Sequence, residues 1–241
     1  MEWIKAERQL VPPLLKASSL ISGDGNQQYA IRTESHAGYR IIDIIMAALP
    51  ETWQNSELGI YRKKFQLLNL QMLMILERIY SHKQITSKKL SKLLYVNDSI
   101  LINYLSKLEK LELITKATSY SYELTDWFKY APVEITCIEA KLFRWKEAIE
   151  QALYNKRFAE RSYIAFPKEI INISTEKNRE LRKLGVGLIL VNKYGEAEIV
   201  INADVNKKKS VEKDIQKIKI LKELLSCKKG KWHLTAKASN V

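Results

Sequence analysis

The spacing of hydrophobic residues changes period several times along the chain, which predicts a succession of helices and strands. Residues 3–15 carry an apolar stripe with helical spacing, and Pro12 and Pro13 are expected to divide or kink this helix. Residues 27–49 alternate like two strands joined by a short link, which predicts a hairpin. In the second of these strands Asp43 has apolar neighbours on both sides. A carboxylate there is costly unless it is paired, bound to a metal or near the strand end.

From about residue 60 the pattern becomes that of a helical module. FQLLNLQMLMILERIYSHKQ predicts one long amphipathic helix, and ITSKKLSKLLYV predicts a short helix capped by Thr86 or Ser87. NDSILINYLSKLEKLELI predicts a third helix. TKATSYSYELTDWF then alternates like a two-stranded ribbon with a small polar tip.

The rest of the chain returns to mixed helices and strands. An apolar strand is expected within 131–144, then a helix to about Ala159, then a short strand in SYIAFP. TEKNRELRKLG predicts a basic helix with Gly185 as its C-cap, and VGLILVNKYGEAEIVINA predicts two strands around a turn. An amphipathic helix is expected in 211–226. The fold class predicted from these elements is α/β.

The charge of the chain indicates a polyanionic partner. The formal net charge is +13, and residues 201–241 carry eleven Lys against four acidic residues. Such a balance fits nucleic acid or an acidic membrane surface, although a Lys-rich tail also serves as a solvated face. The apolar face of the 211–226 helix has no aromatic residue, which makes membrane binding the weaker interpretation.

Cysteine and histidine usage argues against a zinc site. Cys137 lies inside an apolar strand, no CxxC pair accompanies it or Cys227, and the three histidines are scattered. No signal peptide and no membrane-spanning apolar run is recognisable, so no membrane association and a cytoplasmic location are expected.

The middle of the chain resembles the winged helix-turn-helix domains of bacterial regulators. The resemblance rests on ITSKKLSKLLYVNDSILINYLSKLEKLELITK and the ribbon that follows it. It implies that the third helix lies in a DNA groove, although winged helices also act as protein-binding modules. The helix is poor in Arg, so contact with the DNA backbone is expected rather than base reading. Its outward, candidate DNA-binding side chains are Asn97, Ser99, Asn103, Lys107 and Lys110.

Carboxylates on neighbouring strands of an α/β core suit divalent-metal chemistry. Glu139 and Lys141 in VEITCIEAKLF are two residues apart, so they point to the same face of a strand. Mg²⁺ prefers a few carboxylate oxygens and keeps several waters, one of which can attack a phosphodiester. A lysine beside the ion can orient that water or stabilise charge on the phosphate.

The combination of these residues resembles the PD-(D/E)XK nuclease superfamily. That resemblance implies a restriction-endonuclease-like core in which Asp43 is the strand aspartate, with Ile42 in place of the proline. It implies Glu139 and Lys141 as the signature pair, and Glu7 as the helix glutamate, with Glu2 a weaker candidate. The implied Mg²⁺ or Mn²⁺ ligands are Asp43, Glu139 and Glu7.

The helix after the signature offers further candidates by the same resemblance. Some branches of the superfamily carry Gln and Tyr there in a QxxxY pattern, which implies a catalytic role for Gln151. Tyr154 stands one residue too close for that spacing. Arg144 and Lys146, with Lys156 and Arg157 farther along, form a solvated face that would lie beside a phosphate at this site.

The resemblance implies a discontinuous core, 1–57 and 130–241, with the winged helix-turn-helix as an insertion in 58–129. A loop tolerates a domain-sized insertion when its two ends lie close together.

Each candidate also has a structural alternative. Asp43 can be a structural ion pair with Arg40 or Lys141, and Glu139 with Lys141 can be a strand-end salt bridge. Glu7 can be an ordinary surface residue of its helix. The two tryptophans of interest, Trp145 and Trp232, favour packing over base stacking.

The expected function is a Mg²⁺-dependent nuclease that hydrolyses DNA in defence, mobile-element biology or repair. Cleavage of both strands of a duplex favours a homodimer, and partner proteins of a multi-component system are also expected. The alternative is a non-catalytic DNA-binding or interaction protein that uses the winged helix and keeps the core as a scaffold.

Overall fold

The computed structural model describes residues 5–18, 21, 28–37, 40–54, 58–208, 210–226 and 232–235. The chain divides into two compact units. The first, the sheet unit, comprises 1–49, 134–208 and 231–241. The second, the helical unit, comprises 50–133 and 209–230.

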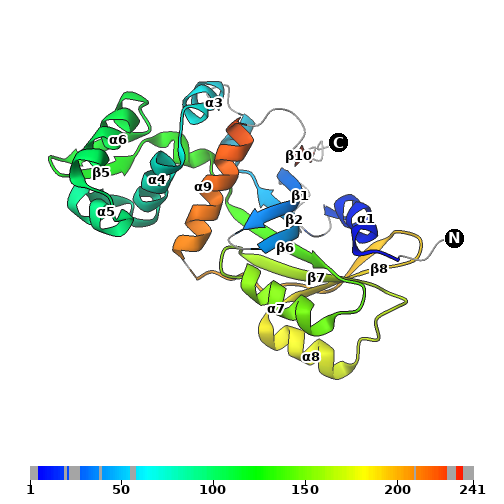
Figure 1. Ribbon diagram of the computed structural model, residues 1–241. Coiled ribbons are helices and arrows are strands. Elements are labelled where there is room, and N and C mark those ends of the chain that lie inside the picture. Colours follow the sequence, from blue (N-terminus) through cyan, green and yellow to red (C-terminus); the bar gives the residue numbers. More distant parts are fainter. Residues whose placement is uncertain are drawn as a thin grey trace. The chain divides into compact units, whose positions relative to one another are not determined.

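The sheet unit is built on one mixed sheet flanked by helices, as predicted (Figure 1). In the described residues seven strands form this sheet in the order β10-β1-β2-β6-β7-β8-β9. Neighbours pair antiparallel, except that β6, β7 and β8 run parallel. Their bounds are β1 (Tyr29–Ala37), β2 (Arg40–Ala48), β6 (Glu134–Ala140), β7 (Arg161–Pro167), β8 (Gly187–Val191), β9 (Ala197–Ile201) and β10 (His233–Leu234).

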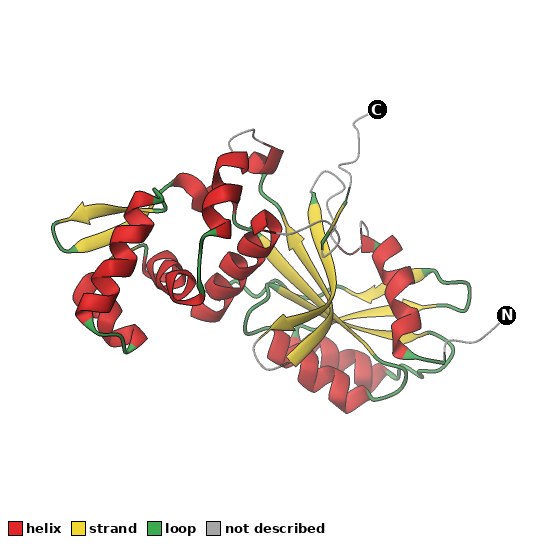
Figure 2. Ribbon diagram, turned by 45° about the horizontal axis from the view of Figure 1, so that its top comes forward, coloured by secondary structure: helices red, strands yellow, loops and turns green. Residues whose placement is uncertain are grey.

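Helices cover both faces of this sheet (Figure 2). One face packs on the 3-10 helix η1 (Glu7–Leu10) and on α1 (Val11–Lys16) through Leu10 and Leu14. The other face packs on α7 (Trp145–Asn155) and α8 (Thr175–Leu184). Because both faces are covered, β6 is buried along nearly its whole length, including the polar residues Thr136 and Glu139.

Several local predictions in the sheet unit are confirmed. The prolines do divide the first helical stripe, since η1 ends where the Pro-containing α1 begins. Gly185 caps α8 with a φ of 61°, a conformation that favours glycine. The strand β10 was not predicted, because its two residues carry no periodic pattern and pair with β1 only through the fold.

The helical unit contains the predicted helices and ribbon. Its described elements are η2 (Glu51–Gln54), α3 (Leu58–Gln66), α4 (Leu70–His82), β3 (Gln84–Thr86), α5 (Ser87–Leu94), α6 (Asp98–Lys110), β4 (Ile114–Thr118), β5 (Ser121–Leu124), η3 (Asp126–Tyr130) and α9 (Val211–Ser226). Thr86 caps α5, as predicted, because its hydroxyl accepts a hydrogen bond from the Lys89 amide at 3.3 Å.

Two predictions about helices in this unit are corrected. The single long helix expected from residue 65 is divided, because Asn69 accepts a hydrogen bond from the Met72 amide and begins α4 there. The 211–226 helix had been placed in the core, but α9 packs on α3 and α4 and belongs to the helical unit. Contact with these helices removes the apolar face of α9 from solvent. Sequence periodicity predicts that such a face is buried, but it does not identify the element that covers it.

The first segment of the helical unit, residues 50–133, is inserted between two strands that pair in the sheet. Ala48 of β2 pairs with Glu134 of β6, so the long insertion begins and ends on adjacent strands. An insertion with neighbouring ends costs little closure entropy. None of the described helices is long and apolar enough to cross a membrane.

A substitution at Gly187 tests the close packing of β7 on β8. Gly187 pairs with Tyr163, and a Cβ at this position would overlap the Tyr163 ring. We expect Gly187→Ala to lower the free energy of unfolding by about 1–3 kcal/mol because of this overlap. Urea denaturation measures the loss.

A double-mutant cycle with Tyr163→Leu provides the control. The smaller side chain makes room for the new methyl group, so the loss caused by Gly187→Ala should shrink in the double variant. Additive losses would show that the ring is not the obstacle.

Candidate metal and phosphodiester site

Two carboxylates meet where β2 lies against β6. Ile44 pairs with Ile138 in the antiparallel ladder, and one step farther along Asp43 faces Glu139. The amide of Ala140 donates a hydrogen bond to Asp43 Oδ2 at 2.8 Å. Directly opposed residues on adjacent strands point to the same face of the sheet. The fold therefore brings together two predicted metal ligands that lie far apart in the sequence.

Glu139 is almost completely buried and has partners inside the protein. Its side chain hydrogen-bonds with that of Asp43, and Asn155 of α7 donates from Nδ2 to its Oε1 at 2.7 Å. The pKa of Glu139 is raised to about 7, chiefly by burial; the Asn155 donor opposes this rise, and the negative charge of Asp43 adds to it.

The same environment also raises the pKa of Asp43. Burial raises its pKa, and the Ala140 amide and the Lys141 charge oppose the rise. Two adjacent carboxyls with raised pKa values favour sharing one proton near neutral pH.

Lys141 is buried directly beyond the end of β6. Its amide continues the ladder by donating to the Ala165 carbonyl at 2.9 Å, and only 6% of the residue is exposed. Its Nζ lies 3.6 Å from Glu7 Oε2 and 4.0 Å from Glu147 Oε1. A buried ammonium needs such partners, so the two glutamates hold the amine in place.

The structural alternatives for these residues can now be assessed. Glu139 and Lys141 are both buried, so they do not form a solvated salt bridge at the strand end. Glu7 contacts Lys141 and is more than an ordinary surface residue. The Arg40 side chain and Glu2 lie outside the described residues.

Helix α7 lines the site with residues four positions apart. Glu147, Gln151 and Asn155 share one helical face. Gln151 donates from Nε2 to Glu147 Oε1 at 3.3 Å, which places it one contact away from Lys141. Tyr154 packs its ring against Phe158 instead.

Sequence reasoning missed Glu147 and Asn155. The QxxxY pattern requires a Tyr four residues after Gln151. That position is Asn155, which contacts Glu139. The spacing of four between Glu147, Gln151 and Asn155 was the available signal.

The donor set fits a hydrated magnesium ion. In the described part of the chain, no three His, Cys, Asp or Glu side chains form a group with the geometry of metal ligands. Glu7 pairs with Lys141 rather than joining the other two carboxylates. Mg²⁺ is often held by one or two carboxylates and keeps several waters, so Asp43 and Glu139 are sufficient. A cation between them would also relieve the repulsion that raises the pKa of Glu139.

A scan against protein-family models, a search of curated proteins and a search of solved structures each found no match.

The candidate DNA-binding residues of the helical unit lie on the exposed side of α6 and at its start. Asn97 is the N-cap of α6, since its Oδ1 accepts from the amide and the hydroxyl of Ser99 at 3.0 and 2.9 Å. Both side chains therefore stabilise the helix end. The other three candidates, Asn103, Lys107 and Lys110, are exposed.

The cations near the carboxylate site differ in their contacts. Arg144 bonds to Glu147 at 3.2 Å, and Lys146 is exposed. Trp145 stacks on Phe166 and donates to Glu180, so its predicted packing role is confirmed. Trp232 directly precedes β10.

The raised pKa of Glu139 generates a pH prediction for the protein in EDTA. The folded state holds this proton more tightly than the unfolded state, in which the carboxyl titrates near 4.5. Stability should therefore fall as pH rises from about 4.5 through 7, by roughly 2–3 kcal/mol. We expect Glu139→Gln to remove this share of the pH dependence in urea denaturation.

Glu77 of α4 supplies a matched comparison. Burial also raises the pKa of Glu77 to about 7, against the attraction of Lys219. Its protonation therefore changes the stability over the same pH range, although Glu77 belongs to the helical unit. Glu77→Gln should remove only the part of the pH dependence of stability that comes from Glu77. A Glu139→Gln variant with the full pH dependence of the wild type would contradict the burial of a shared proton at Asp43 and Glu139.

Proposed function

We propose that the protein is a Mg²⁺- or Mn²⁺-dependent nuclease of the PD-(D/E)XK type that hydrolyses DNA. The observation that carries this proposal is the pairing of Asp43 and Glu139 on adjacent strands with buried Lys141 beside them. Packing alone does not account for bringing Asp43 to the distant Glu139 and Lys141, because desolvating like charges costs free energy.

The order of elements also supports the proposal. An antiparallel series β1-β2-β6 is followed by α7 and the parallel strand β7, with η1 and α1 preceding the series. This order is similar to that expected for a restriction-endonuclease-like core. The helical unit, with its order α4, α5, α6 and a β4–β5 ribbon, is similar to a winged helix inserted between β2 and β6.

Each side chain has a role in the proposed reaction. Asp43 and Glu139 would hold the ion, which supplies positive charge at the phosphate and lowers the pKa of bound water. Lys141 would orient the attacking water or stabilise negative charge on the phosphate oxygens. Asn155 positions Glu139, and Glu7 and Glu147 position Lys141.

Hydrolysis then exchanges one bond to phosphorus for another. The water oxygen bonds to phosphorus, and the bond from phosphorus to the leaving sugar oxygen breaks. One proton is lost from the water, and one is gained by the leaving oxygen.

The helical unit would hold the DNA. Residues 58–129 carry twelve Lys and Arg against six Asp and Glu. Lysines on the exposed side of α6 suit phosphate contacts, which give salt-sensitive affinity with little sequence preference. A role in defence, mobile-element biology or repair, a homodimer, partner proteins and a cytoplasmic location stay predictions.

A cleavage assay tests the nuclease proposal. Wild-type protein should cleave plasmid or labelled single-stranded DNA with Mg²⁺ or Mn²⁺ but not in EDTA. Asp43→Asn should abolish cleavage because a metal ligand is lost, and Lys141→Met should lower the rate by about 10²–10³-fold. Gel electrophoresis and the release of labelled fragments measure the rates.

Glu176→Gln is the matched control, because it removes an exposed carboxylate of α8. It should cleave like the wild type. If no metal supports cleavage, and DNA binding persists unchanged in Asp43→Asn and Lys141→Met, the alternative of a non-catalytic DNA-binding protein holds instead.

The winged-helix assignment generates a binding prediction. Lys107→Ala and Lys110→Ala should each weaken DNA binding to a similar extent on unrelated sequences. Each should also lower the slope of log affinity against log salt by about 1, since one phosphate contact is lost. Fluorescence anisotropy across a salt series measures both quantities.

Lys63→Ala serves as the charge-matched control, because Lys63 is exposed on α3. A salt slope that changes as much in Lys63→Ala as in the α6 variants would contradict DNA contact through α6.

A further inference from the structure

Exposed hydrophobic side chains gather at one edge of the sheet unit. Among its described residues seven large hydrophobic side chains are exposed, and four of them flank strand ends at a single edge. These four are Ile41, Phe143, Ile170 and Tyr194. A single exposed apolar residue is ordinary, but a concentration at one edge indicates a contact surface.

The topology defines this edge. The parallel strands β6, β7 and β8 all end there, and the antiparallel strand β2 begins there. Phe143, Ile170 and Tyr194 follow the three parallel strands, and Ile41 is near the start of β2. Asp43, Glu139 and Lys141 lie at the same edge, since β2 begins and β6 ends close to them. In open α/β sheets this edge is where ligands bind.

Phe143 is the member of this group that follows the Glu139–Lys141 pair. It lies two residues after Lys141 in the turn between β6 and α7, with 65% of its surface exposed. The turn is held in place on both sides, because the Lys141 amide bonds to Ala165 and the Trp145 amide bonds to the Phe143 carbonyl. A backbone held by these bonds therefore presents an exposed aromatic ring two residues after Lys141.

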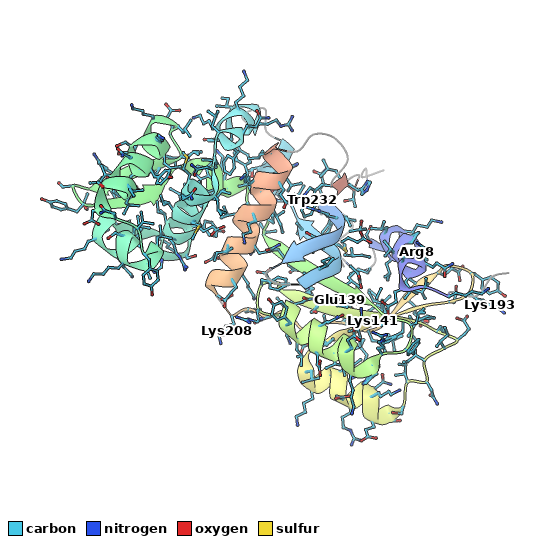
Figure 3. The ribbon with its side chains drawn as sticks, viewed as in Figure 1. Arg8, Glu139, Lys141, Lys193, Lys208 and Trp232 are labelled. Atoms are coloured by element: carbon cyan, nitrogen blue, oxygen red, sulfur yellow. The ribbon has the colours of Figure 1, made fainter. Side chains whose placement is uncertain are left out.

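Positive charges accompany these apolar side chains. Arg144 is adjacent to Phe143, and the Lys193 Nζ lies 5.2 Å from the ring centre of Tyr194. In Figure 3 Lys141 is on the side of Glu139 that is nearer to Arg8 and Lys193. Aromatic rings interleaved with cations are typical of surfaces that bind single-stranded nucleic acid, where bases stack and phosphates pair with cations.

We propose that Phe143 is a stacking platform for an unpaired base beside the scissile phosphate, so that the enzyme prefers DNA with a single-stranded nucleotide at the cleavage position. This inference rests on the proposed nuclease function and names its substrate class. Within a duplex both faces of each base are covered by neighbouring bases. Only a single strand, a flap or an extruded nucleotide offers a free face to the Phe143 ring.

The experiment compares Phe143→Ala with the wild type on three labelled DNAs. These are a duplex, the single strand of the same sequence, and a duplex with a single-stranded flap. Affinity is measured by fluorescence anisotropy with Ca²⁺ in place of Mg²⁺, and cleavage is measured with Mg²⁺. We expect Phe143→Ala to weaken both readouts about 5- to 100-fold on the single strand and the flap, with little change on the duplex.

Two variants control for other effects. Phe143→Tyr keeps an aromatic ring and should retain the preference for unpaired DNA. Leu153→Ala removes an exposed apolar side chain from α7 and should behave like the wild type. Because Phe143 is exposed, its replacement should leave thermal unfolding unchanged, which circular dichroism verifies.

The outcomes separate this inference from the nuclease proposal. Equal losses on all three DNAs, or no loss, would overturn the stacking role even if cleavage depends on Asp43. A change of oligomeric state in sedimentation without a change in DNA affinity would overturn it in favour of a protein contact at this edge. Selective loss of single-strand binding in a protein that never cleaves would support the platform and reject the nuclease.

Discussion

The placement of two like-charged carboxylates side by side, one buried and one half-buried, is the constraint around which the sheet unit is arranged. Loss of hydration raises the pKa of both Asp43 and Glu139, and the negative charge of Asp43 adds to the rise at Glu139. The surrounding groups offset part of this cost: the Ala140 amide supports Asp43, and Asn155 supports Glu139. The two carboxylates therefore lower the stability of the metal-free protein, and a bound cation would offset this loss. Functional sites often lower the stability of a fold in this way.

Strand pairing is what makes this arrangement possible. An antiparallel ladder fixes which residues face each other, so the alignment of β2 with β6 sets the distance between the two carboxylates. The same alignment joins Ala48 to Glu134, where the inserted helical unit begins and ends. A large insertion therefore leaves the geometry of the site unchanged, because the strands beside it remain paired.

The two units present surfaces with different chemistry. The exposed side of α6 is mainly polar and carries lysines, which suit the uniform charge of a phosphate backbone. The edge of the sheet unit presents exposed aromatic and aliphatic side chains among cations. Such a surface suits unstacked, unpaired bases. The proposed division is that one unit holds DNA by charge and the other selects the form of DNA at the site.

Most of the local elements, and the residues of the candidate site on β2 and β6, could be predicted from short sequence patterns. Helical and strand periodicity located most of the elements, and an Asp in an apolar strand together with the Glu-Ala-Lys triplet pointed to a carboxylate site, because these are short-range patterns. The packing of α9 on α3 and α4 and the pairing of β10 with β1 could be found only from the folded structure. The same holds for the contact of Asn155 with Glu139 and for the contacts of Glu7 and Glu147 with Lys141. Those contacts join residues distant in sequence, and which of them form depends on strand register and helix packing rather than on local spacing.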